Sequence, residues 1–121
     1  MLAIPAKKSL PELGNASMSK KEYKLQILPL FEEDLNEIVD YITFKLKNPA
    51  AANDLVDAIE DAIYNRLPNA ESFEPYKSVK EREYPYYRIR VKNFTVFYVV
   101  IGDVMEVRRI LYSRRDLTKL L

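Results

Sequence analysis

The residues best suited to chemistry in this sequence are arginines, and most of them stand in its C-terminal half. They form three pairs. Arg88 and Arg90 alternate with apolar residues, Arg108 and Arg109 are adjacent, and so are Arg114 and Arg115. A guanidinium stays charged at physiological pH and binds phosphate or carboxylate through paired hydrogen bonds. These arginines predict a surface for an anionic partner, either nucleic acid or an acidic protein. Solvated arginines on an exposed strand would give the same pattern.

The composition limits the chemistry that this surface could support. The chain has no Cys and no His, which excludes disulfides, thiolate metal sites and the usual imidazole base. Any catalysis would have to use Arg, Lys, Tyr, Asp or Glu. We therefore expect neither a metal nor a cofactor.

The net charge of +1 conceals two halves of opposite sign. Residues 1–75 carry 8 Lys and Arg against 13 Asp and Glu, whereas residues 76–121 carry 11 against 5. Acidic helices followed by basic strands would account for the difference without any function. Together with the arginine pattern, however, the asymmetry favours a basic surface for an anionic partner.

The length of 121 residues is that of one ordinary domain. Residues 1–19 combine prolines, a glycine and serines without a sustained period, so we expect a flexible extension there and a single domain over residues 20–121. No segment approaches the length of a membrane span, and the first residues lack the apolar run of a secretion signal. The expected compartment is the cytoplasm, with no membrane partner.

The elements that must position the arginines begin with a strand over residues 23–28. A helix is expected to start at Pro29 or Leu30, because proline is tolerated in the first turn and acidic residues follow it. Its apolar residues recur at helical spacing and predict one buried face: Phe31, Leu35, Ile38, Ile42 and Leu46.

A second helix is expected after a very short turn. Asn48 is a typical N-cap and Pro49 a typical first helical residue. The apolar face of this helix comprises Ala52, Leu55, Val56, Ile59, Ile63 and Leu67. The two helices should be antiparallel.

Three strands rich in β-branched and aromatic residues follow, over residues 86–91, 95–101 and 104–112. The dipeptides Lys92-Asn93 and Gly102-Asp103 between them tolerate positive φ and predict tight turns. The strands should therefore form an antiparallel meander. The predicted fold class is α+β, with one sheet packed against a helical hairpin.

Strand alternation assigns side chains to the two faces of this sheet. Tyr86, Arg88 and Arg90 should share one face and their neighbours the other. In the last strand, Arg108 and Arg109 should point to opposite faces of the sheet. The middle strand is apolar on both faces, which predicts that a partner or the C-terminal tail covers the side away from the helices.

The sequence resembles the RelE/ParE family of type II toxins over nearly all of residues 23–121. The order of the elements carries the resemblance, together with NPAAA at residues 48–52, YRIRVKNFTVFYVV at 87–100 and RRILYSRRDLTKLL at 108–121. It implies the RelE/ParE fold and a cognate antitoxin that wraps the sheet and helices and keeps the toxin inactive.

The same resemblance implies one of two targets. RelE-like members cut messenger RNA in the ribosomal A site, where basic side chains hold the scissile phosphate. ParE-like members poison DNA gyrase. The paired basic positions of the RelE-like nucleases match Arg88 and Arg90, and the basic residue after the last strand matches Arg115. These nucleases have a further basic residue at the start of the middle strand, directly after an aromatic residue. In this sequence the corresponding position holds Thr95.

A nuclease would also need a proton acceptor, and an arginine is a poor base at neutral pH. The family's C-terminal tyrosine has no counterpart in residues 117–121, so Tyr112, Tyr86 or Glu83 would have to serve. The candidates for an active site are therefore Arg88, Arg90, Arg115 and Tyr112, of which Tyr112 would enter the site from another direction.

Three interpretations remain: a gyrase poison, which the residue at position 95 favours, a ribosome-dependent endoribonuclease, and a non-toxic relative that only binds an antitoxin. Arg108, Arg109 and Arg114 are the candidates for contact with a partner or target. Arg109 could instead pair with Glu106 or with a helix carboxylate.

Overall fold

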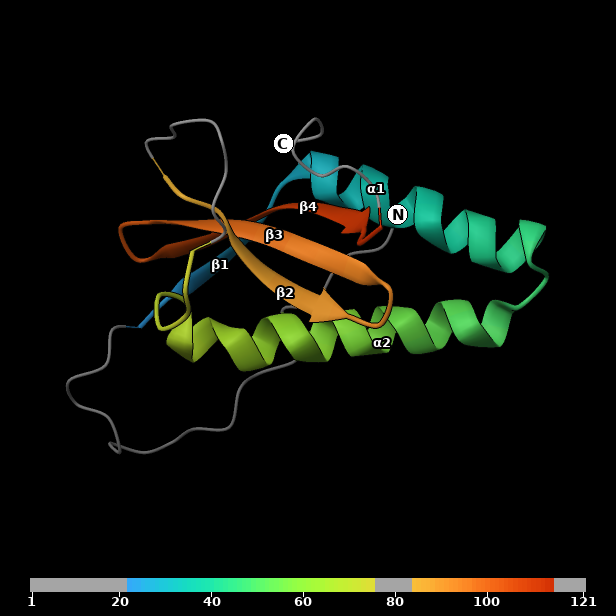
Figure 1. The fold of residues 1–121 in the computed structure, drawn as a ribbon, viewed down its shortest axis with the longest axis horizontal. Coiled ribbons are helices and arrows are strands. Elements are labelled where there is room, and N and C mark those ends of the chain that lie inside the picture. Colours follow the sequence, from blue (N-terminus) through green and yellow to red (C-terminus); the bar gives the residue numbers. More distant parts are fainter. Residues whose placement is uncertain (1–21, 76–83, 115–121) are drawn as a thin grey trace.

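A computed structural model describes residues 22–75 and 84–114, which form a four-stranded sheet and a helical hairpin (Figure 1). The chain runs through β1 (Lys24–Ile27), α1 (Pro29–Asp40), a π-helical turn (Tyr41–Lys45), α2 (Pro49–Arg66), a short 3-10 turn (Leu67–Asn69), β2 (Tyr87–Val91), β3 (Phe94–Ile101) and β4 (Val104–Tyr112). The α+β class and the order of elements are confirmed. The proposed extension over residues 1–19 lies outside the described residues.

The sheet has the strand order β1-β4-β3-β2. The three C-terminal strands form the expected antiparallel meander, while β1 runs parallel to β4, with Lys24 opposite Val104 and Ile27 opposite Val107. Because β1 stops at Ile27, the rest of β4 has no strand partner on that side. Helix α1 packs along β4, and α2 packs against β2.

Both turns of the meander form where the dipeptides predicted them. Lys92 has φ 53° and Gly102 has φ 64°, so each turn places one residue in the left-handed region. Gly102 adopts this conformation without steric cost. No helix in the described part of the chain is both long enough and apolar enough to cross a membrane.

The helices bury their apolar faces on one side of the sheet, hereafter the helix-covered face. Asn48 caps α2 as predicted, its side-chain oxygen accepting a hydrogen bond of 3.1 Å from the Ala51 N–H. The core joins both helices to alternate residues of every strand, and its fully or nearly fully buried members include Phe31, Leu35, Leu55, Ile59, Ile63, Val96, Tyr98 and Val107.

The predicted apolar face of the first helix fails at its C-terminal end. Leu46 is 55% exposed, although its spacing from Ile42 placed it on the buried face. The cause is the π-helical turn, in which the Leu46 N–H bonds to the Tyr41 carbonyl at 3.0 Å, five residues back. The wider turn rotates the end of the helix and turns Leu46 away from the core.

The opposite side of the sheet, hereafter the second face, carries a smaller apolar cluster. Tyr86, Phe97, Val99 and Leu111 form it, and Phe97 and Val99 are fully buried within the chain. The middle strand is therefore covered on both faces, as its sequence required.

Candidate functional site

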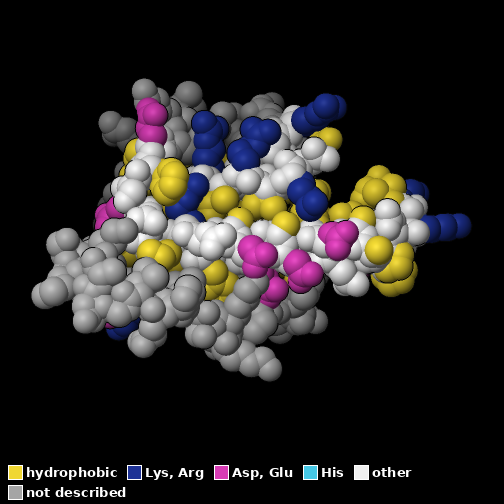
Figure 2. All heavy atoms as spheres, turned by 90° about the horizontal axis from the view of Figure 1, so that it is seen from below, with side chains coloured by type: hydrophobic (Ala, Val, Ile, Leu, Met, Phe, Trp, Pro, Cys, Tyr) yellow, Lys and Arg dark blue, Asp and Glu magenta, His cyan; other side chains and the backbone are white. Residues whose placement is uncertain are grey.

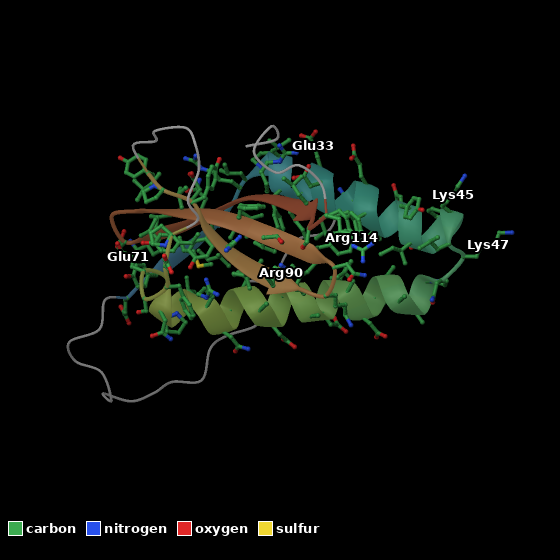
Figure 3. All side chains as sticks on the ribbon, in the orientation of Figure 1. Glu33, Lys45, Lys47, Glu71, Arg90 and Arg114 are labelled. Carbon is green, nitrogen blue, oxygen red and sulfur yellow. The ribbon has the colours of Figure 1, made fainter. Side chains whose placement is uncertain are left out.

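Arg88 and Arg90 project from β2, the outermost strand of the sheet, and both are exposed. Arg88 is the register partner of Phe97 and Arg90 that of Thr95. Since directly opposed residues share a face, both arginines belong to the second face, as alternation predicted. Figure 3 labels Arg90 near the end of β2.

Thr95, at the position where the resemblance leads one to expect a cation, is buried with 2% of its surface exposed. Its hydroxyl lies 2.7 Å from the Ser113 hydroxyl, just beyond β4. The Ser113 N–H also donates to the Asn93 carbonyl at 2.9 Å. Thr95 therefore ties the β2–β3 hairpin to the end of β4 and offers no charge to a ligand.

Tyr112 lies on the opposite side of the sheet from Arg88 and Arg90. It is the register partner of Phe94, and the two rings meet edge-on with centroids 5.7 Å apart. Phe94 packs against the core of the helix-covered face. Of the candidates for an active site, Arg88 and Arg90 thus share one face and Tyr112 lies on the other. Arg115 lies outside the described residues.

The prediction that Arg108 and Arg109 point to opposite faces is wrong. The register of β3 and β4 shifts between Phe97, which opposes Arg109, and Tyr98, which opposes Val107. This irregularity leaves Arg108 as an extra residue without a partner in β3, as in a β-bulge, and alternation breaks down. Both side chains consequently belong to the second face.

Arg108 is held by neighbours on that face. Its Nε donates to Glu106 Oε2 at 2.8 Å, and its guanidinium lies 5.9 Å from the centre of the Tyr86 ring. Burial lowers the pKa of Arg108, but the hydrogen bonds to Glu106 and Tyr86 more than offset this, so the pKa is raised. Its charge is largely compensated within the fold.

Arg109 reaches around the edge of the sheet to helix α1. Its Nε and Nη2 donate to the two oxygens of Asp34 at 2.7 and 2.9 Å. Asp34 also accepts the Ile110 N–H at 3.2 Å, at the part of β4 that β1 does not cover. The hydrogen bond to Asp34 raises the pKa of Arg109. This confirms pairing with a helix carboxylate and indicates a structural role.

Arg114 follows β4 and is exposed (Figure 3). Exposed basic side chains of the described chain therefore include Arg88, Arg90 and Arg114, whereas Arg108 and Arg109 are engaged by carboxylates. On the side of the molecule seen in Figure 2, basic side chains gather apart from a group of acidic ones. Exposed acidic residues of α2 include Asp54, Asp57 and Asp61.

A family model described as the ParE toxin of the type II toxin-antitoxin system parDE matches residues 25–117. The chain belongs to the ParE toxin family. One similar solved structure is described as the chromosomal ParDE toxin-antitoxin system from P. aeruginosa. It has a TM-score of 0.62 and 18% sequence identity, and the match covers 75% of this chain and 96% of that one. The likeness shows a shared fold. A comparison with curated proteins found no match.

Two residues that sequence reasoning did not single out help to build the basic surface of this ParE-family toxin. Asp34 is one, and its signal was its place one turn after Phe31 on the buried side of the helix. Arg66 is the other, at the last turn of α2, where a basic residue is favoured by the helix dipole. Neither position in the helix indicates which distant residue the side chain binds, Arg109 for Asp34 and the backbone of Arg88 for Arg66.

Arg66 connects α2 to the outer strand. Its Nη1 donates to the Arg88 carbonyl at 3.2 Å and to the Tyr98 hydroxyl at 2.9 Å, while its guanidinium stacks 3.6 Å from the centre of the Phe73 ring. The Tyr98 hydroxyl in turn donates to the Ala70 carbonyl at 2.8 Å. This network fixes the backbone of β2 at Arg88. No group of three or more His, Cys, Asp or Glu in the described ranges could hold a metal ion.

Proposed function

We propose that this ParE-family chain is a growth-inhibiting toxin that poisons DNA gyrase in the cytoplasm and is neutralised by a cognate antitoxin. The choice of gyrase as the target rests on the residue at position 95. A buried, hydrogen-bonded threonine stands where the ribonuclease relatives would need a cation. Gyrase poisoning by ParE-like toxins requires no such group.

The chemistry of RNA cleavage supports the same choice. Attack of a 2′-hydroxyl on its phosphate needs a proton acceptor, a cation for the phosphorane and a proton donor for the leaving oxygen. Arg88 and Arg90 could supply the cation. Tyr112, however, lies on the opposite face, and Tyr86 is 8% exposed and packed in an apolar cluster. Of the two tyrosines considered as the base, neither places an exposed hydroxyl beside Arg88 and Arg90, and the third candidate, Glu83, lies outside the described residues.

The antitoxin is the partner that the exposed arginines fit best. Arg88 and Arg90 project from an edge strand, and an acidic segment laid along that edge would neutralise both charges. Coverage of this surface by the antitoxin would also keep it from the target. This accounts for inhibition without a conformational change in the toxin.

The function is tested by inducing the chain alone in bacteria and pulse-labelling the cells. A gyrase poison should stop thymidine incorporation before methionine incorporation and induce the DNA-damage response, and co-expression of the neighbouring antitoxin should restore growth. Early loss of methionine incorporation, with messages cleaved at ribosomal A sites, would establish the ribonuclease alternative. Normal growth at well-expressed, soluble levels would leave only an antitoxin-binding relative.

The arginines are tested in the same cells by Arg88→Ala and Arg90→Ala. Each should reduce growth arrest strongly while leaving the melting temperature nearly unchanged, because exposed strand residues contribute little to stability. Lys24→Ala is the matched control, since Lys24 is an exposed cation on the opposite edge strand with only a 3.9 Å contact to Asp103. Full arrest by both arginine variants would contradict a role for this surface.

A further inference from the structure

The tip of the helical hairpin carries an apolar patch that the arginine surface does not include. Tyr41, Phe44 and Leu46 are 55%, 72% and 55% exposed, the three highest values among the exposed large apolar residues of the described chain. All three fall within six consecutive residues of the π-helical turn and the loop after it. Exposed apolar side chains that gather in this way mark interaction sites more often than single ones do.

The backbone of the tip gives the patch its shape. The π-helical turn rotates Leu46 out of the core, and Lys47 then adopts φ 54°, which ends the helix without a glycine. A positive φ is uncommon for a residue other than glycine, and π-helical turns are rare in general but frequent at functional sites. In Figure 1 the hairpin extends past the end of the sheet, so the patch forms a protruding knob.

Two lysines border the knob. Figure 3 shows Lys45 and Lys47 pointing away from the body of the molecule, and Figure 2 shows hydrophobic and basic side chains gathered at the same end. Asp40 is the acidic residue nearest in sequence, at the end of α1. The knob is therefore apolar at its centre and positively charged at its border.

This charge argues against occupants supplied by the chain itself. A second copy packed tip to tip would bring the same lysines against Lys45 and Lys47. Residues 1–21 carry 4 Lys against 1 Glu, residues 76–83 carry 3 Lys and Arg against 2 Glu, and residues 115–121 carry 2 against 1. Each of these segments is net positive, whereas the border of the knob calls for carboxylates.

The shape argues against the antitoxin as well. An extended or helical segment that wraps a toxin binds in grooves or along strand edges, whereas a protruding knob fits a pocket in a folded protein. We propose that the hairpin tip docks the toxin onto its target, with Tyr41, Phe44 and Leu46 entering an apolar pocket whose rim carries carboxylates that pair with Lys45 and Lys47. This rests on the proposed function, which supplies the target, DNA gyrase.

The test uses purified gyrase holoenzyme as the probe and full-length toxin variants. Phe44→Ser removes the most exposed apolar side chain, and Lys45→Glu with Lys47→Glu reverses the border charge. Leu30→Ser is the apolar control, because Leu30 is 46% exposed at the other end of α1, and Lys45→Arg with Lys47→Arg retains the charge. Unchanged melting temperatures would show that all variants fold.

Both tip variants should bind gyrase about tenfold or more weakly and lose growth arrest, whereas both controls should behave as wild type. Unchanged binding and arrest in the tip variants would overturn the proposal. Loss of antitoxin neutralisation alone would assign the tip to the antitoxin. If wild type binds anionic lipid vesicles and the tip variants do not, the tip would be assigned to a membrane. If wild type is a dimer and the tip variants are monomers, the tip would be assigned to self-association.

The same measurements separate this inference from the proposed function. A wild-type chain that arrests growth but does not bind gyrase would refute gyrase as the target. The tip would then be judged by whether Phe44→Ser abolishes arrest while antitoxin binding persists. A wild-type chain that neither binds gyrase nor arrests growth would overturn both proposals.

Discussion

At the residue scale, Asp34 shows how a charged side chain becomes part of the core. It is 9% exposed and satisfies both the Arg109 guanidinium and the Ile110 N–H at the open edge of β4. Without it, a partly buried cation and a backbone donor would both lose the carboxylate that they bind. Removing such a carboxylate costs free energy mainly because the buried groups that it binds lose a hydrogen-bond acceptor.

Asp34→Ala should therefore lower the free energy of unfolding by about 3 kcal/mol. Asp103→Ala is the matched control, because Asp103 meets Lys24 at 3.9 Å with half of its side chain exposed. That variant should change stability by less than about 0.5 kcal/mol. Urea denaturation followed by circular dichroism measures both, and equal losses would refute a structural role for the buried pair.

Tyr23 provides a pH-dependent test. Its hydroxyl donates to Glu71 at 2.6 Å, and this hydrogen bond is the main reason that its pKa is raised from 10.0 to about 12. A folded-state pKa above the unfolded value means that the contribution to stability is complete below pH 10 and is lost as the pH rises toward 12.

In an ultraviolet titration of the tyrosines, Tyr23→Phe should remove one of the late-titrating phenols, and Glu71→Gln should make that phenol titrate earlier. Tyr87 and Tyr98 also have raised pKa values because they are buried, so the difference between variants is the informative quantity. A Glu71→Gln curve identical to wild type would show that the carboxylate does not hold the Tyr23 proton.

At the scale of elements, the hairpin and the meander could be predicted because local signals fix them. The Asn48-Pro49 pair sets the start of α2, and the turns at residues 92–93 and 102–103 set the register of neighbouring strands. Alternation also gave the faces of β2 correctly. These signals act over a few residues and need no knowledge of distant contacts.

The rest could not be predicted, because it depends on contacts far apart in sequence. The irregularity in β4 moved Arg108 and Arg109 onto one face, and the partner of Arg109 lies 75 residues away. The π-helical turn exposed Leu46 although its α-helical spacing was regular. Consequently the sequence named the arginines of the candidate site but not which of them remain exposed.

The buried face of α2 is tested by Ile59→Asp, since Ile59 is fully buried between the helix and the sheet. An unpaired carboxylate there should cost about 4 kcal/mol or more and unfold most of the protein. Asn65→Asp introduces the same residue at an exposed position of the same helix and should have little effect. A cooperative melt of Ile59→Asp at the wild-type temperature would contradict the packing.

At the scale of the whole molecule, two candidate surfaces lie on different parts of the fold. Arg88 and Arg90 belong to the outer strand of the sheet, and the apolar knob ends the helical hairpin (Figures 1 and 3). The arginine surface is proposed to meet both the antitoxin and the target, whereas the tip is proposed to meet the target alone. Mutations at the tip should therefore impair toxicity without impairing neutralisation.

The central claim is that this ParE-family toxin acts on gyrase, and it is tested most directly with the purified enzyme. Wild-type toxin added to gyrase, ATP and supercoiled plasmid should produce linear DNA after detergent and protease treatment, because a poison traps the cleaved complex. Arg88→Ala should yield much less. Absence of trapped cleavage, together with toxin-dependent cutting of messenger RNA on purified translating ribosomes, would contradict the account.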